Sequence, residues 1–225
     1  LRSRTKFNGD QLNGFLNSRG YNEVAYDYDH LQSNQSKMVN SGWFFVNAQE
    51  TYGVNALLAF CMGLLESGCK VAIIGISDRV FARAEEFQKK GYCCEGVKAD
   101  LGLQEERVRA FHECVHLLGG HLDILVTAHG IQSRHLSEEF PMEDWERVVG
   151  VNLTAVFELC QLAAKQFMSQ ESKGKIITVS SMLSFFGGYT VPAYAASKGG
   201  VAQLTKALGN EWAGKGICVN SLAPG

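Results

Sequence analysis

The sequence lacks several features that would assign it quickly to a class of protein. It has only three prolines, no CxxC cysteine pair and no uncharged apolar run long enough to span a bilayer. The 21 lysines and arginines are interspersed with 23 acidic residues, which leaves no basic face for nucleic acid and no polybasic segment for a membrane. We therefore expect small molecules or proteins as partners.

The seven cysteines also lack the pattern of a disulfide-bonded protein. Their number is odd, and most of them lie inside apolar runs. We predict buried free thiols and a reducing, cytoplasmic location.

Short apolar runs alternate with amphipathic stretches from residue 43 onward. The runs 43–46, 70–76, 93–99, 122–128, 174–180 and 216–222 are typical of strands, and the stretches 54–67, 79–90, 103–118, 143–170 and 192–213 of helices. Because such alternation favours right-handed crossovers, we predict an α/β fold with a Rossmann-type, doubly wound parallel sheet of six strands. Ligands of this fold bind beyond the carboxyl ends of the strands, so site residues should follow the apolar runs.

The first 42 residues have a different character. They are rich in Asn, Ser, Gly, Asp and Tyr and show no sustained period. We predict a polar, mostly irregular extension over residues 1–42 and the α/β domain over residues 43–225. Because the chain starts at Leu1 and stops at LAPG after the sixth predicted strand, we interpret it as a fragment.

Four polar residues form the most informative pattern. Ser181 follows the apolar run at 174–180, Asn152 lies in the long predicted helix before it, and Tyr194 and Lys198 stand four residues apart in the helix after it. That spacing puts Tyr194 and Lys198 on one helix face. A phenol, with a pKa of about 10, exchanges protons at neutral pH only if a cation such as Lys198 favours the phenolate. Taken alone, the pair is more typical of a solvated helix face.

Together with AD at 99–100, LDILVTAHG at 122–130 and the closing NSLAPG, these residues resemble the short-chain dehydrogenase/reductase family over about residues 43–225. The resemblance implies that a nicotinamide cofactor carries a hydride, that Tyr194 exchanges a proton with the substrate oxygen and that Ser181 hydrogen-bonds this oxygen. It also implies that Lys198 holds the nicotinamide ribose and that Asn152 anchors a water linking Lys198 to solvent. The family continues into a substrate lid and a seventh strand, which this chain does not contain.

The resemblance implies cofactor-binding positions as well. Asp100, with Leu101 beside it, matches the position that binds adenine, although Asp100 could equally cap the next helix. Gly130 allows close backbone approach, while TAHG at 127–130 departs from the family's NNAG. Pro224 and Gly225 are the matching positions at the end of the chain.

The family's glycine-rich TGxxxGxG loop is only partly matched. An ungapped alignment puts Thr51, Asn55 and Leu57 at the three glycines, whereas a lengthened loop puts Ala48, Gly53 and Asn55 there. We favour the second register, because a leucine at the third position would crowd the helix against the strand. After the second predicted strand, Asp78 favours NAD through bonds to ribose hydroxyls, with NADP as the alternative.

Within the family, SMLSFFGGYTVPAYAASKGGVAQLTKALGNEWA and AAKQFM resemble the group of 2-deoxy-D-gluconate 3-dehydrogenases, also described as 2-dehydro-3-deoxy-D-gluconate 5-dehydrogenases. This implies a sugar-acid substrate at Ser181 and Tyr194, and a homotetramer of the full-length protein packed through residues 143–170 and 192–213. Arg134 and His135 could bind the substrate carboxylate or serve only solubility. The alternatives are a gluconate 5-dehydrogenase, a 3-oxoacyl carrier protein reductase and a non-catalytic relative with an impaired cofactor loop.

The sequence HECVH at 112–116 also fits the HExxH motif of zinc proteases. In a helix, however, Phe111 and Val115 lie on the apolar stripe, so His112 and His116 fall on the polar flank. His121 misses the extended form of the motif by one residue. We therefore predict no metal site.

Overall fold

The computed structural model describes residues 56–224, with side chains from Cys61 onward. The predicted extension at 1–42, the predicted strand at 43–46 and the predicted cofactor residues Ala48, Gly53, Asn55 and Gly225 lie outside the described residues. Residues Leu57–Gly225 form one compact unit.

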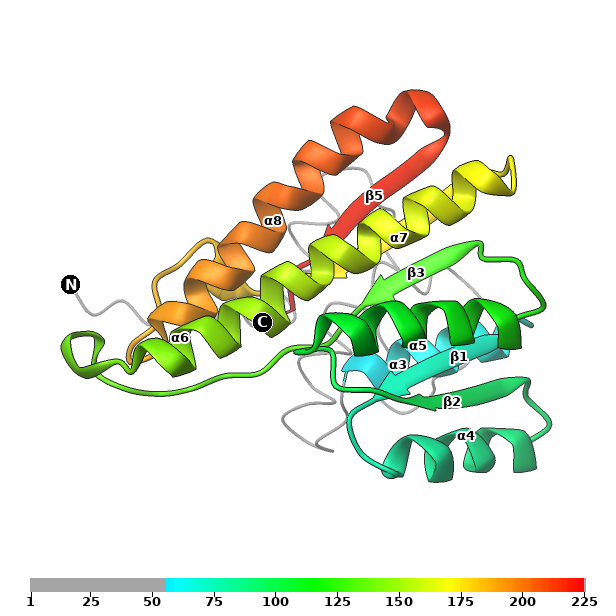
Figure 1. Cartoon of the computed structure of the whole chain (residues 1–225), viewed down its shortest axis with the longest axis horizontal. Coiled ribbons are helices and arrows are strands. Elements are labelled where there is room, and N and C mark those ends of the chain that lie inside the picture. Colours follow the sequence, from blue (N-terminus) through cyan, green and yellow to red (C-terminus); the bar gives the residue numbers. More distant parts are fainter. Residues whose placement is uncertain (1–55, 225) are drawn as a thin grey trace, which may run out of the picture. The chain divides into compact units, whose positions relative to one another are not determined.

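Strands and helices alternate along the described chain, as predicted (Figure 1). The strands are β1 (Val71–Gly75), β2 (Cys94–Lys98), β3 (Ile124–Thr127), β4 (Gly174–Val179) and β5 (Ile217–Leu222). The α-helices are α3 (Ala56–Glu66), α4 (Arg79–Lys89), α5 (Gln104–Leu117), α6 (Met142–Val149), α7 (Ala155–Ser169) and α8 (Pro192–Trp212). Short helical turns are η1 (Ser137–Glu139), η2 (Gly150–Thr154), η3 (Met182–Ser184) and η4 (Ala213–Lys215).

All strand pairs among the described residues are parallel, which confirms the predicted α/β class. β1 pairs with β2, and β4 lies between β3 and β5. Five of the six predicted strands are therefore confirmed, each to within two residues of its predicted ends. The sixth, at 43–46, stays a prediction.

The core has helices on both faces of the strands. Val71 and Ile73 of β1 pack with α3 and α4, whereas Ile74 packs against Ala110 and Cys114 of α5. Successive side chains of a strand point to opposite faces, so α3 and α4 cover one face and α5 the other. A larger cluster joins α5, α7 and α8 over β4 and β5, centred on residues such as Phe167 and Ile176 that have no exposed surface.

An apolar cavity of about 440 Å³ lies between the facing edges of β1 and β3. Residues 71–74 and 124–126 line its two sides, and Leu64, Phe111 and Leu159 contribute from the helices. His129, which follows the end of β3, also lines the cavity.

The long helix predicted at 143–170 is interrupted. A π-helical turn, η2, separates α6 from α7 and contains the buried Asn152. The whole stretch Met142–Ser169 is apolar and long enough to cross a membrane, yet 44% of its most apolar window is buried inside the domain. Core helices of globular proteins have the same character.

The cysteines are free, but their burial differs from the prediction. Cys61, Cys94 and Cys160 are buried, whereas Cys93 and Cys218 are exposed. Burial raises the pKa of Cys61 to about 11 and that of Cys160 to about 12, so these thiols stay protonated and unreactive.

Candidate active site

Helix α8 brings the predicted pair Tyr194 and Lys198 together. The helix begins at Pro192, whose missing N–H would have had no partner in the first turn. The Lys198 Nζ lies 5.9 Å from the centroid of the Tyr194 ring. The two side chains therefore share one face of the helix, and the half-buried Tyr194 remains open to a ligand.

Lys198 is a buried cation. Only 3% of its surface is exposed, and its Nζ donates a 2.7 Å hydrogen bond to the Val179 carbonyl at the end of β4. Burial lowers the pKa of Lys198 to about 8, and no carboxylate pairs with it among the described residues. At neutral pH the ammonium stays mainly charged, in surroundings that do little to screen it.

Ser181 stands where β4 ends and η3 begins. Its Oγ accepts a hydrogen bond from the Leu183 N–H, and its own N–H donates to Ser184 Oγ. Ser184 Oγ in turn donates to the Lys198 carbonyl at 2.7 Å. This reciprocal cap ties Ser181 to α8, and it leaves the Ser181 hydroxyl proton without an acceptor among the described side chains.

Asn152 links the site to the loop after β3. Its amide donates to the Ile131 carbonyl and to Ser197 Oγ, and its Oδ1 accepts from the Ile131 N–H at 2.8 Å. Ser197 Oγ donates to the Tyr194 carbonyl. With no exposed surface of its own, Asn152 holds the β3 loop against α8.

Gly130, in the same loop, lies beside Asn152 and Lys198. A Cβ on Gly130 would lie 3.4 Å from Asn152 Oδ1 and 3.5 Å from Lys198 Nζ. The missing side chain therefore keeps open the space beside the Lys198 ammonium.

His129, next to Gly130, is a polar residue in an apolar setting. Its Nε2 is fully buried and has no hydrogen-bond partner among the described residues, although part of the residue reaches the surface. Burial, and then the nearby Lys198 charge, lower the pKa of His129 to about 4. His129 is therefore neutral at pH 7. Thr127 Oγ1, two residues earlier, is buried and unpaired in the same way.

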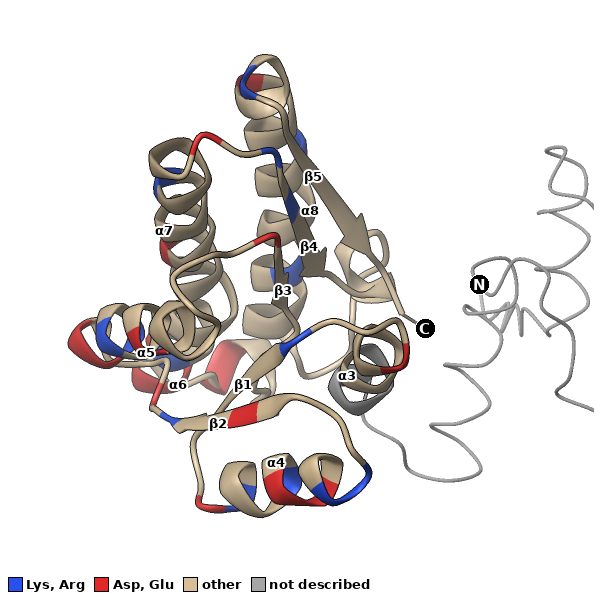
Figure 2. Cartoon of the chain, turned by 90° about the vertical axis from the view of Figure 1, so that its right-hand side faces the viewer, with Lys and Arg blue, Asp and Glu red and all other residues tan. Residues whose placement is uncertain are grey.

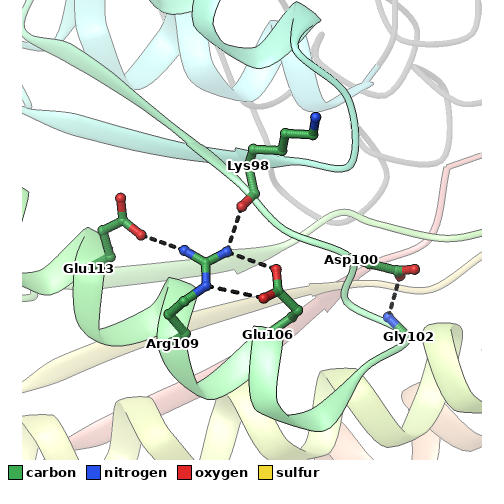
Figure 3. A network of polar contacts seen from close by, with 6 residues as sticks. All are labelled: Lys98, Asp100, Gly102, Glu106, Arg109 and Glu113. Atoms are coloured by element: carbon green, nitrogen blue, oxygen red, sulfur yellow. Dashed lines mark hydrogen bonds and ion pairs between the residues drawn. The ribbon is translucent and has the colours of Figure 1, made fainter.

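The predicted adenine position lies at the end of β2. Asp100 Oδ1 accepts a 2.8 Å hydrogen bond from the Gly102 N–H, so it stabilises the turn into α5 (Figure 3). Arg107 donates to the Leu101 carbonyl and forms a buried ion pair with Glu158 of α7. The loop that carries Asp100 and Leu101 is thus fixed from two sides.

Two further predicted cofactor residues, Pro224 and Asp78, contact different parts of the domain. The Pro224 carbonyl accepts from the Met182 N–H, which brings the end of the described chain beside Ser181. Asp78, the predicted ribose acceptor, forms a 2.8 Å ion pair with Lys98 at the end of β2.

The glutamate of the HExxH sequence, Glu113, forms an ion pair within α5. Figure 3 shows Arg109 between two carboxylates and a carbonyl: it donates to Glu113 at 2.6 Å, to Glu106 at 2.8 Å and to the Lys98 carbonyl at 2.7 Å. The carboxylate that a zinc protease would use as its base is therefore paired with a cation. No group of three metal-ligating side chains occurs within residues 61–224.

Arg134 and His135 follow β3 but behave differently. Arg134 is exposed, whereas His135 is half-buried and its Nε2 lies 2.8 Å from Asp144 Oδ2. Of these two candidate carboxylate ligands, only Arg134 has no carboxylate partner among residues 61–224.

Sequence reasoning missed three residues that shape this site: His129, Ser184 and Ser197. For His129 the sequence did offer a signal, because a histidine stands at the third position of the family's NNAG motif. The two serines bond to backbone groups and, among many serines, gave no signal at all.

A family model for short chain dehydrogenases matches residues 58–225. A 2-dehydro-3-deoxy-D-gluconate 5-dehydrogenase of Escherichia coli (strain K12) is 40% identical over 168 residues, which are 73% of this chain and 64% of that protein. The enzyme of the same name from Bacillus subtilis (strain 168) is 53% identical over 104 residues, 46% of this chain and 41% of that protein. The chain thus spans less than two thirds of the length of these relatives.

Solved structures agree in fold. A gluconate 5-dehydrogenase from Burkholderia cenocepacia J2315, in complex with NADP and tartrate, matches with a TM-score of 0.71 and 32% identity over 78% of this chain and 68% of that one. Figure 2 shows acidic and basic residues intermixed along helices such as α4. With the family model covering most of its length, this chain belongs to the short-chain dehydrogenase family.

Proposed function

We propose that the chain is part of an NAD(P)-dependent oxidoreductase. This enzyme interconverts a keto and a hydroxy group of a sugar acid of the 2-deoxy-D-gluconate or 2-dehydro-3-deoxy-D-gluconate type. The observation that carries this proposal is the buried Lys198 ammonium beside the accessible Tyr194 phenol. The Val179 carbonyl holds this cation beside the Tyr194 ring, whereas the cation of a solvated helix pair would not be fixed in one place.

In the proposed reaction Tyr194 exchanges a proton with the substrate oxygen. The hydrogen bond to the Val179 carbonyl fixes the Lys198 ammonium beside the Tyr194 ring. Ser181 donates its free hydroxyl proton to the same substrate oxygen, since its Oγ lone pair already accepts from Leu183. Asn152 would anchor the water that reconnects Lys198 with solvent.

When bound, the nicotinamide cofactor would supply or accept the hydride. The space left by Gly130 beside Lys198 fits the close approach of such a group to the protein backbone. The residues that would hold it are Asp100, Leu101, Gly130, Tyr194, Lys198 and Pro224, together with Ala48, Gly53, Asn55 and Gly225.

Asp78 supports NAD as the cofactor, because a carboxylate can accept hydrogen bonds from ribose hydroxyls. Its ion pair with Lys98 supports NADP as a second cofactor, because that cation offsets the repulsion of a ribose phosphate. The relative from Burkholderia cenocepacia was solved with NADP. We propose that the chain accepts both.

For the substrate, Arg134 supplies an exposed guanidinium in the loop after β3, which suits the carboxylate of a sugar acid. The names of the E. coli and B. subtilis relatives, and the tartrate in the Burkholderia structure, support an acid of this class.

The test combines binding with turnover. Titration with NADH and NADPH should show binding, and Tyr194→Phe should lower kcat for a keto-sugar acid by about 10²- to 10⁴-fold while cofactor binding is retained. Tyr189→Phe is the matched control, because Tyr189 is 83% exposed and lies in the loop before α8. Equal turnover by the Tyr194→Phe variant and wild type would contradict the proposed role of Tyr194. Failure to bind either nucleotide would favour a non-catalytic relative.

A further inference from the structure

The loop after β3, residues 130–136, is fastened at both ends to parts of the candidate active site. Near its start, Ile131 exchanges two backbone hydrogen bonds with the Asn152 side chain. Near its end, the His135 N–H donates to the Thr190 carbonyl, four residues before Tyr194. The loop therefore connects Asn152 with the segment that leads into α8.

A side-chain clamp holds this middle section against α6. Asp144 Oδ2 accepts a 2.5 Å hydrogen bond from Ser133 Oγ and lies 2.8 Å from His135 Nε2. The ring of His135 also packs edge-on against Phe140, with centroids 5.1 Å apart. The other oxygen of Asp144 meets the exposed Arg147 at 3.2 Å. The hydrogen bonds from Ser133 and then His135 lower the pKa of Asp144, so the carboxylate stays charged at neutral pH.

Ser133, His135 and Asp144 have the composition of a hydrolase triad but not its geometry. In a triad, the histidine stands between the serine and the carboxylate and accepts the serine proton. Here Ser133 Oγ lies 3.1 Å from His135 Nε2, but both atoms bind the same carboxylate oxygen, and Ser133 donates its proton to Asp144. The cluster therefore orders the chain and does not activate a nucleophile.

Arg134 stands between the two residues that Asp144 holds. With the Gln132 amide oxygen turned toward it, that oxygen accepts from Arg134 Nε at 2.7 Å and from Nη2 at 2.9 Å. The guanidinium has no carboxylate partner among residues 61–224. The side chain of Arg134 is exposed, and its Nη1 has no hydrogen-bond partner among the described residues.

We propose that Asp144 is a positioning residue for substrate selection: by holding Ser133 and His135 it fixes Arg134 for the carboxylate of the acid substrate. This inference rests on the proposed function. A fixed cation loses less conformational freedom on binding than a mobile one, so the clamp should tighten the binding of charged substrates. It should leave the proton chemistry at Tyr194 unaffected.

The experiment compares Asp144→Asn with wild type on 2-deoxy-D-gluconate and on its uncharged carboxamide. Asparagine keeps the shape but loses the charge that binds His135. We expect the KM for the acid to rise about threefold to tenfold, with kcat within about twofold and the KM for the carboxamide unchanged. Glu143→Gln is the matched control, since it removes the neighbouring, exposed carboxylate of α6, which has no partner in the clamp. Thermal unfolding of each variant checks the fold.

Arg134→Ala and the double variant separate the steps of the argument. Arg134→Ala should raise the KM for the acid at least as much, and Asp144→Asn should add little to it, because both act through one contact. If Arg134→Ala raises this KM and Asp144→Asn does not, or if Asp144→Asn raises both KM values equally, the positioning role of Asp144 is wrong while the proposed function stands. If no acid is turned over by wild type, the proposed function fails and the inference fails with it.

Discussion

At the residue scale, Lys198 is a cation held in a buried place, although an ammonium group is more stable in water. Burial opposes the charge of Lys198, and a single carbonyl, that of Val179, compensates in part. Residues that are costly to bury and yet retained are typical of functional sites. The two serines that bond around α8, Ser184 and Ser197, provide the rigidity that such a cation needs.

His129 gives a prediction at the same scale. Its pKa is about 4 in the folded chain and about 6.5 when exposed, so the unfolded chain binds more protons between these values. Stability should therefore fall as the pH drops from 6.5 to 4. We expect wild type to lose up to about 3 kcal/mol relative to His129→Ala over this interval, measured by urea unfolding at a series of pH values.

The control for this pH series is His116→Ala, because His116 lies exposed on α5. That variant should follow the wild-type pH dependence. If the His129→Ala variant showed the wild-type slope as well, the buried His129 ring would not be the source of the acid sensitivity.

At the scale of elements, close packing between helix and strand sets a sharp limit on substitution. Gly174 begins β4, and a Cβ there would lie 2.1 Å from the ring of Phe167, which has no exposed surface. We predict that Gly174→Ala lowers the free energy of unfolding by about 1–3 kcal/mol or more, because neither the ring nor the strand has room to move. Chemical denaturation measures the loss.

Gly63→Ala in α3 is the matched control for this substitution. A Cβ at Gly63 meets nothing within 4 Å, so alanine should stabilise the helix by up to about 1 kcal/mol. A loss of stability at Gly63 equal to that at Gly174 would mean that steric contact with Phe167 does not decide the outcome.

The elements also show what sequence can and cannot predict. Periodicity located five described strands and their helices, because the strands are buried runs and the helices have one apolar face. It missed the π-helical turn around Asn152, since an inserted backbone turn leaves the apolar pattern of residues 143–170 nearly unchanged. The sequence also indicated the same candidate role, carboxylate binding, for Arg134 and His135, because only the tertiary contact of His135 with Asp144 distinguishes them.

The same limit applies within the candidate site. Tyr194 and Lys198 were found together because they lie within one helical turn. Their relation to Asn152 depends on contacts across the β3 loop, which local sequence spacing does not encode. Resemblance to a family supplied that relation before the structure did.

At the scale of the whole molecule, α7 presents a face of mixed apolar and polar side chains outside the core of the described domain. Phe157 is 43% exposed and Met168 is 41% exposed. They are eleven residues apart, about three turns, so they lie on one face of the helix. The polar or charged Gln161 and Lys165 stand between them along this face. Such a face suits the predicted homotetramer packed through residues 143–170 and 192–213.

We therefore predict that Phe157→Lys weakens self-association, because it would bury an unpaired charge at the centre of the helix contact. Phe81→Lys is the matched control, since Phe81 is 48% exposed on α4, outside the predicted contact. Sedimentation equilibrium should give wild type and Phe81→Lys the mass of a tetramer, and Phe157→Lys a smaller mass at the same concentration. If Phe157→Lys retained the full mass while Phe81→Lys lost it, the contact would lie on α4, and the packing through α7 and α8 would be wrong.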